Sequence, residues 1–187
     1  MVNNASNVSV GKPRAAGGVF SAPVSTAAPT NATTALAAGY VGLGYVSDSG
    51  LVNSISTDTS DINAWGGDRV LSVRTSRSES FQFTFIETNA DVLKEVYGQD
   101  NVSEASGALT VLHNGKANPV RRYVFEIALT GDRVKRIVVP NGQITEVGDV
   151  TYVDGDPIGY EVTVSAYPDA NGNTAIEYIA TVTAPST

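Results

Sequence analysis

The sequence has no cysteine among its 187 residues. A disulfide framework, a thiolate metal site and a cysteine nucleophile are therefore all excluded. Histidine occurs only once, as His113. A single histidine with no Ser/Asp pattern around it favours a structural residue over a catalytic base or a metal ligand. We therefore expect no catalytic residue, no metal site and no cofactor.

Long apolar runs are also missing. No stretch approaches the roughly 20 apolar residues that a helix needs to span a bilayer. The N-terminus, MVNNASNVSV, lacks the basic and then apolar pattern of a signal peptide. We expect a soluble protein that is made in a cytoplasm and has no membrane partner.

Basic residues are absent from the last part of the chain, where Arg136 is the final one. The acidic residues beyond it are Glu146, Asp149, Asp154, Asp156, Glu161, Asp169 and Glu177. These residues account for the whole net charge of -7, so the preceding residues balance. The bias is typical of a solvated surface that keeps a protein soluble, and equally of an acidic wall that repels phosphates or meets a basic partner.

Glycine, valine and threonine are frequent, which favours strands joined by turns. With 42% hydrophobic residues, the chain is long enough for one core. We predict a β-rich α+β fold, with an N-terminal arm over residues 1–32 and a single domain over residues 33–187. Within the arm, Val19, Phe20 and Val24 are apolar enough to add a short strand to the same domain or to a neighbouring copy.

The clearest strand lies over residues 80–85. Phe81, Phe83 and Phe85 alternate there with polar residues, the pattern of a strand with one buried face. Leu71 and Val73 suggest a partner strand before it. A second hairpin is predicted from residues 43–46 to residues 51–55.

The clearest helix follows directly. Val92, Leu93 and Val96 recur at helical spacing, Asn89 can cap the first turn, and Gly98 can end the helix. This pattern predicts one short helix packed against the phenylalanine-lined sheet.

The segment 56–67 is polar and ends at Trp65, the only tryptophan, which is followed by two glycines. We interpret it as a long loop with the tryptophan at its tip. Trp65 either covers the edge of the core or anchors the loop in a pocket of a partner, since tryptophan often dominates interfaces.

A core strand is predicted over residues 123–129, followed by a turn at Gly131–Asp132 and a strand over residues 133–139. A two-residue turn would set Leu129 opposite Val134. The basic residues of this hairpin are Arg121, Arg122, Arg133, Lys135 and Arg136. Exposed aromatic residues do not interleave with them and the chain is acidic, so a contact with an acidic neighbour explains them better than nucleic-acid binding.

Two glycine-containing stretches are not expected to form a phosphate-binding loop or a calcium-binding loop. GYVGLGYVS continues into a strand, whereas a phosphate-binding loop leads into a helix. Asp169-Ala-Asn-Gly-Asn resembles half of a calcium loop but lacks the distal acidic ligand, and Asn-Gly is a hairpin turn in its own right. Further strands are predicted over residues 144–152, 160–167 and 175–183.

Taken in order, these segments resemble the major tail proteins, or tail tube subunits, of long-tailed bacteriophages, in particular those that infect actinobacteria. The resemblance rests on VGKPRAAGGVFSAP, NATTALAAGYVGLGYVSDSGLVNS, INAWGGDRVLSVRTSRSESFQFTFIETNADVLKEVYG and VKRIVVPNGQITEVGDVTYVDGDPIGYEVTVSAYPDANGNTAIEY. It runs from about residue 10 to residue 178.

The resemblance implies a β-sandwich or barrel-like tail tube fold with one short flanking helix, an N-terminal arm and a long loop. It further implies a structural subunit, not an enzyme, that forms stacked hexameric rings around the path of DNA ejection. The implied partners are copies of itself and other tail proteins such as the tape measure and the tail terminator. DNA would pass without specific binding, and the subunit would be assembled in the host cytoplasm into the virion tail.

Two sets of residues follow from this expectation. A ring needs two different complementary surfaces on each subunit. We predict that the subunit interface includes Phe20, Trp65, Arg121, Arg122, Arg133 and Lys135. A conduit that does not hold DNA needs carboxylates on its lining. We predict that the lumen is faced by some of Glu146, Asp149, Glu161 and Glu177.

Two other functions stay open at this point. An immunoglobulin-like adhesion or binding module on a virion or cell surface is compatible with many short strands. An enzyme whose carboxylate pair forms only in three dimensions is also compatible with the sequence.

Overall fold

The computed structural model describes residues 3–15 and 17–182, and the described part is mostly β-structure with one short α-helix. The helix is α1 (Ala90–Tyr97), and two 3-10 turns are η1 (Ala5–Asn7) and η2 (Gln99–Asn101). The strands are β1 (Gly11–Pro13), β2 (Val19–Pro23), β3 (Val41–Gly42), β4 (Val52–Asn63), β5 (Arg69–Phe85), β6 (Val102–Ala105), β7 (Ala108–Val111), β8 (Arg121–Leu129), β9 (Arg133–Val147), β10 (Tyr160–Tyr167) and β11 (Ile176–Thr181). The predicted β-rich α+β class is confirmed.

The strands of the described residues form a nine-stranded antiparallel sheet and a separate two-stranded sheet of β6 and β7. The order in the large sheet is β3-β2-β8-β9-β10-β5-β4, with β1 also pairing β8 and β11 also pairing β9. β9 is the central strand, because β8 lies along one side while β11 and β10 share the other. The sheet is open, with β3 and β4 at the two ends of this order.

The core lies where the predicted phenylalanine strand meets the predicted helix. Phe81, Phe83 and Phe85 are buried, and the Phe81 ring stacks on Phe125 of β8 with centroids 5.2 Å apart. Asn89 Oδ1 accepts a hydrogen bond from the Val92 backbone N–H at 2.9 Å, as expected of an N-cap. The predicted strand, helix and helix cap are therefore confirmed.

The hairpin before the core strand differs from the prediction. Leu71 and Val73 belong to the same continuous strand as the phenylalanines, β5, and the partner of β5 is β4. The predicted pairing of residues 43–46 with residues 51–55 was wrong. β4 is exposed along its whole length, so it carries no alternation of buried and exposed residues from which its pairing could be predicted.

The turn between β8 and β9 also differs. Leu129 lies opposite Arg133, not Val134, so the register prediction was wrong by one residue. The three-residue turn 130–132 places Gly131 and Asp132 at positive φ, 75° and 54°. β9 then runs without interruption through residues predicted to form two strands, and a register shift opposite Arg121 and Tyr123 of β8, at residues 139–142, marks the irregularity between them.

The N-terminal segment is part of the sheet. β2 pairs with β8, with Val19 opposite Phe125 and Phe20 opposite Val124. The predicted short strand of the arm thus adds to its own domain.

Candidate assembly surfaces

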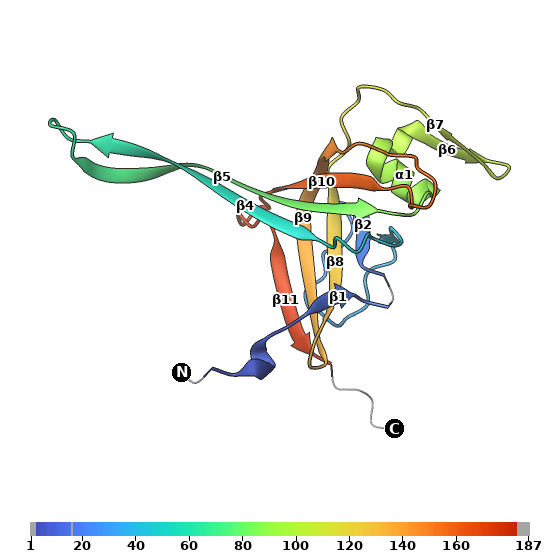
Figure 1. Cartoon of the computed structure of the whole chain (residues 1–187), viewed down its shortest axis with the longest axis horizontal. Helices are drawn as coiled ribbons and strands as arrows, with labels where there is room; N and C mark the ends of the chain where they lie inside the picture. Colours follow the sequence, from blue (N-terminus) through green and yellow to red (C-terminus); the bar gives the residue numbers. More distant parts are fainter. Residues whose placement is uncertain (1–2, 16, 183–187) are drawn as a thin grey trace.

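The β4–β5 hairpin projects away from the rest of the molecule (Figure 1). The turn at its tip is closed by a hydrogen bond of 2.7 Å from the Ala64 N–H to the Asp68 carbonyl oxygen, and Gly66 and Gly67 take positive φ there. Trp65 sits in this turn and the residue is fully exposed, at 107%. Sequence reasoning placed Trp65 at the tip of a loop, and the structure places it at the tip of two paired strands.

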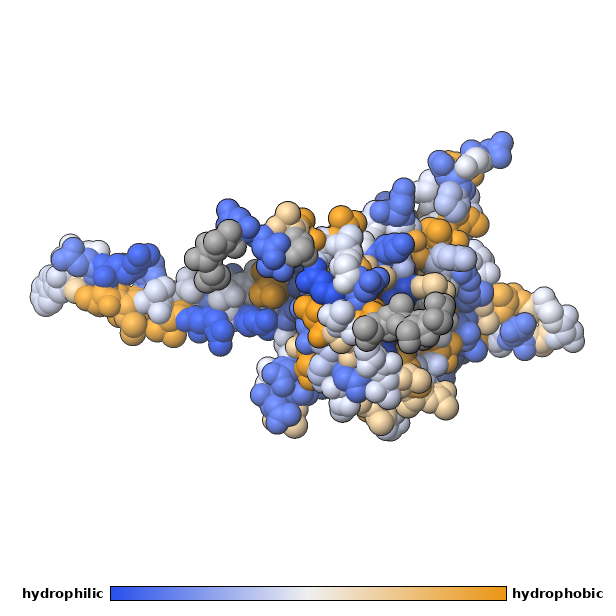
Figure 2. Space-filling view, turned by 90° about the horizontal axis from the view of Figure 1, so that it is seen from below, coloured by the Kyte–Doolittle hydropathy of each residue, from blue (hydrophilic) through white to orange (hydrophobic). Residues whose placement is uncertain are grey.

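The outer half of the hairpin has one apolar and one charged face. Ile62 pairs directly with Leu71, and Val73 lies two residues along β5, so the three exposed side chains share one face, the apolar tip face. The opposite face carries an ion pair of 3.3 Å between Arg69 Nη1 and Asp61 Oδ2. Figure 2 shows hydrophobic residues along one side of the hairpin and hydrophilic residues along the other. An exposed apolar strand face is typical of a surface that contacts another protein chain.

A second surface, the polar face, lies on β5, β10 and the end of β9, on the side of these strands that points away from the core. It consists of Ser80, Gln82, Thr84, Thr145, Glu146, Glu161, Thr163 and Ser165. Gln82 Nε2 donates to Glu161 Oε1 at 2.7 Å, and the Thr145 and Ser165 hydroxyls lie 2.8 Å apart. None of these residues is Lys or Arg. The face continues onto the hairpin through Ser54 and Ser56, which pair with Ser80 and Ser78.

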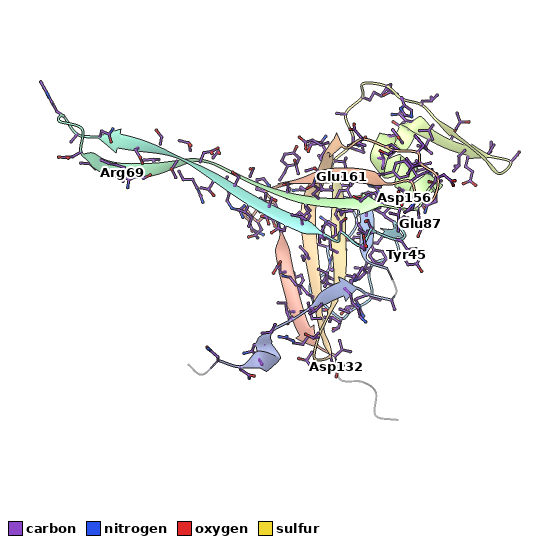
Figure 3. The ribbon with its side chains drawn as sticks, in the orientation of Figure 1. Tyr45, Arg69, Glu87, Asp132, Asp156 and Glu161 are labelled. Carbon is purple, nitrogen blue, oxygen red and sulfur yellow. The ribbon has the colours of Figure 1, made fainter. Side chains whose placement is uncertain are left out.

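The four predicted lumen acids do not all share this face. Glu146 and Glu161 lie on it, and Glu161 is labelled in Figure 3. Asp149 is exposed in the loop after β9. Glu177 lies on β11, where its Oε2 is 2.7 Å from Lys135 Nζ. The sheet topology groups two of these acids because β9 and β10 are neighbours, which their spacing in the sequence does not reveal.

The basic residues predicted for the interface have partners within their own chain. Arg121 Nε lies 2.7 Å from Glu95 Oε1, and the Arg121 side chain is only 13% exposed. Arg122 donates to the Thr26 carbonyl oxygen, and Arg133 donates to the Ser9 hydroxyl. Their role in a subunit interface stays a prediction, as does that of Lys135 and of Phe20, whose ring packs near Gly17 and Gly42.

Two buried carboxylates hold the N-terminal segment and the helix in place, and sequence reasoning missed both. Glu95 of α1 accepts hydrogen bonds from the hydroxyls of Ser21 and Tyr123, at 2.6 and 2.7 Å. Burial, together with the charge of Glu95, raises the pKa of Tyr123 well above its ordinary value, so this phenol stays protonated and donates.

Glu126 of β8 is the second buried carboxylate. Its Oε1 is 2.5 Å from Arg136 Nε and its Oε2 is 2.7 Å from Arg14 Nη1. Arg136 Nη1 also donates to the carbonyl oxygens of Asn31 and Thr34, at 2.7 and 2.9 Å. The network therefore fixes the segment 24–40 against the outer side of β8 and β9. A charged residue in the middle of an apolar strand, such as Glu126 between Phe125 and Ile127, is the signal that could have indicated it.

Glu79 anchors the base of the hairpin. It accepts hydrogen bonds from Asn53 Nδ2 and Arg77 Nη2, at 3.1 and 3.0 Å, and from the Thr174 hydroxyl. Burial alone would raise the pKa of Glu79, but these hydrogen bonds and the charge of Arg77 outweigh it, and the pKa lies below its ordinary value. Glu79 is thus held as a carboxylate that ties β5 to β4 and to the turn before β11.

Other kinds of site find no support in the described part of the chain. No group of three or more His, Asp or Glu residues is placed there to hold a metal ion. Within residues 3–15 and 17–182, no helix is long and apolar enough to cross a membrane.

Comparison with known proteins gives a match over the full length. No curated protein matches the chain. Among solved structures, a chain of the structure titled "Virion of native gene transfer agent (GTA) particle" is 12% identical with a TM-score of 0.38, and the match covers 82% of this chain and 93% of that chain. The family model described as phage tail tube protein matches residues 1–187. This protein therefore belongs to the phage tail tube protein family and is a structural component of a phage tail.

Proposed function

We propose that this chain assembles head to tail with copies of itself into stacked hexameric rings, and that these rings form the conduit through which DNA leaves the virion. Assembly would take place in the host cytoplasm, together with other tail proteins. The observation that carries the proposal is the apolar tip face of the β4–β5 hairpin, which projects from the body with Ile62, Leu71 and Val73 exposed. A projecting apolar face needs a partner surface, and in a ring stack the partner is another copy.

Electron microscopy of the concentrated protein tests this assembly. We expect rings or tubes from the native chain and none from a Val73→Asp variant, because a carboxylate on the apolar tip face would lose its hydration in the contact. Thr59→Asp is the matched control, since Thr59 lies on the other face of the hairpin, opposite Arg74. It should assemble like the native chain. Native protein that stays monomeric at high concentration would contradict the proposal and favour a surface-displayed binding module.

We further propose that the polar face lines the conduit. Its hydroxyl, amide and carboxylate groups include no cation, so it offers DNA phosphates no ion pair to hold them. Glu146 and Glu161 would add repulsion. This proposal narrows the predicted lumen acids to the two that share a face.

Charge reversal on the polar face should convert a sliding surface into a binding one. Tubes of the Glu146→Lys/Glu161→Lys variant are expected to retain nuclease-protected DNA at about 50 mM salt and to release it at about 200 mM. Asp154→Lys/Asp156→Lys changes the charge equally in the exposed loop after β9 and should protect none. Protection of equal amounts of DNA by both variants would show that the polar face does not line the lumen.

A further inference from the structure

We propose that Trp65 of one copy inserts into an apolar pocket at the base of the hairpin of the next copy. This inference rests on the proposed self-assembly and names the contact that the hairpin makes. The pocket has a volume of about 440 Å³ and lies between β1 and the segment 46–51. Its walls include Pro13, Leu51 and Ile127, and its floor is formed by Phe83 and Phe125.

The floor of the pocket is the aromatic core itself. Phe83 and Phe125 are 2% and 1% exposed, and their rings meet edge to face with centroids 5.5 Å apart. Because these rings are almost fully covered, an entering side chain would mainly contact the more exposed lining residues Pro13, Leu51 and Ile127. The volume falls in the range of about 300–1,000 Å³ that is typical of ligand pockets, so the space is large enough for an indole ring.

The pocket wall is fixed before any partner arrives. The Ser47 N–H donates to the Thr84 carbonyl oxygen at 2.8 Å, and the Tyr45 N–H donates to Glu87 Oε1 at 2.7 Å. Tyr45 and Glu87 lie side by side at this end of the sheet (Figure 3). These bonds hold the segment 46–51 against β5, so binding costs little reorganisation.

Trp65 cannot fill the pocket of its own chain. Leu51 lines the pocket and directly precedes β4, whereas Trp65 follows the far end of that 12-residue strand. At about 3.3 Å per residue, the strand separates the two by roughly 40 Å. A Trp65 that enters this pocket must therefore belong to another copy, and a fully exposed tryptophan at the tip of a projecting hairpin suits it.

The charges next to Trp65 in the hairpin tip and those around the pocket are complementary. Asp68 and Arg69 follow Trp65 in the tip, one acidic and one basic. The pocket rim carries Lys12 from β1 and Asp48 from the segment 46–51, again one basic and one acidic. One orientation of the tip would set Asp68 near Lys12, while the reverse would set it near Asp48, where like charges repel. Arg69 already pairs with Asp61 of its own hairpin. Asp48 and the Ser47 hydroxyl also offer oxygen acceptors to the indole N–H, which a buried tryptophan requires.

Because Trp65 is the only tryptophan, its fluorescence reports this contact directly. On assembly of the native chain we expect the emission maximum to move to shorter wavelength and acrylamide quenching to fall. Trp65→Ala should raise the critical concentration for assembly about 30-fold, the loss typical of an interface hot spot.

Exchanging the charges of Lys12 at the pocket and Asp68 at the hairpin tip tests whether Trp65 enters this pocket. Lys12→Glu and Asp68→Lys should each raise the critical concentration about fivefold, and the double variant Lys12→Glu/Asp68→Lys should restore it. Both residues are exposed, so the fold should be unaffected. Lys116→Glu, an exposed basic residue in the loop after β7, is the matched control and should assemble like the native chain.

The outcomes separate this inference from the proposed function. Tubes in which the emission and quenching of Trp65 are unchanged would overturn the inference and leave the tube function standing. A buried Trp65 without restoration in the double variant would show that the tryptophan binds a different surface. Native protein that never assembles would overturn both proposals.

Discussion

Replacing Glu126 with glutamine is expected to lower the free energy of unfolding by about 3–5 kcal/mol. Arg136 has a side chain that is 3% exposed and would keep its charge without a carboxylate to balance it. An uncompensated buried charge is among the most destabilising results of a single substitution. Urea denaturation followed by circular dichroism measures the change.

Glu177→Gln is the matched control for this prediction. It also removes a carboxylate that pairs with a basic residue of β9, Lys135, but Glu177 is 47% exposed. Water screens such a pair, so its loss should cost less than about 1 kcal/mol. Equal losses in the two variants would mean that the Glu126 network does not hold the segment 24–40.

Phe125→Ala is also expected to lower the free energy of unfolding by about 3–5 kcal/mol. The Phe125 ring stacks on Phe81 and meets Phe83 edge to face, so truncation leaves a cavity in the middle of the aromatic cluster. Thermal unfolding followed by circular dichroism or calorimetry measures the loss.

Phe20→Ala also removes a phenylalanine ring, but from the neighbouring strand β2, and it serves as the control for Phe125→Ala. Phe20 is only partly buried and faces the opposite side of the sheet from Phe125. We expect a clearly smaller loss of stability in the monomer. A Phe20→Ala variant as unstable as Phe125→Ala would contradict the position of the core on the Phe81–Phe125 side of the sheet.

The substitutions of Glu126 and Phe125 should also affect assembly, because both residues support the pocket that is proposed to receive Trp65. Phe125 and Glu126 both line the pocket, and Glu126 also pairs with Arg14. Variants that weaken the monomer are therefore poor tests of the interface. Exposed positions such as Val73, Lys12 and Asp68 separate assembly from folding.

Elements with a buried face were predictable from the sequence. The helix Ala90–Tyr97 and the phenylalanine strand each combine a clear period with a stop or cap signal, and those signals act over a few residues. The hairpin was predicted only in part, because residues 52–78 have no buried face to impose a period. The tip at Trp65 was nevertheless marked by its two glycines.

The candidate surfaces were less predictable than the fold. Trp65 was singled out from the sequence because a large apolar residue stood beside flexible glycines. Arg121 and Arg136 were grouped as a surface patch, yet each pairs with a buried carboxylate, Glu95 or Glu126. A sequence shows that a residue is charged, but its exposure depends on which strands and segments cover it.

The sequence by itself determined the β-rich class, the phenylalanine core, the capped helix and the lack of cysteine chemistry, because these depend on composition and on neighbours a few residues apart. Only the tertiary structure decided that Glu146 and Glu161 share a face without cations and that Trp65 stands roughly 40 Å from the pocket it suits. The physical reason is that strand pairing joins residues far apart in the chain. A shift of one residue in that pairing would turn each side chain to the other face.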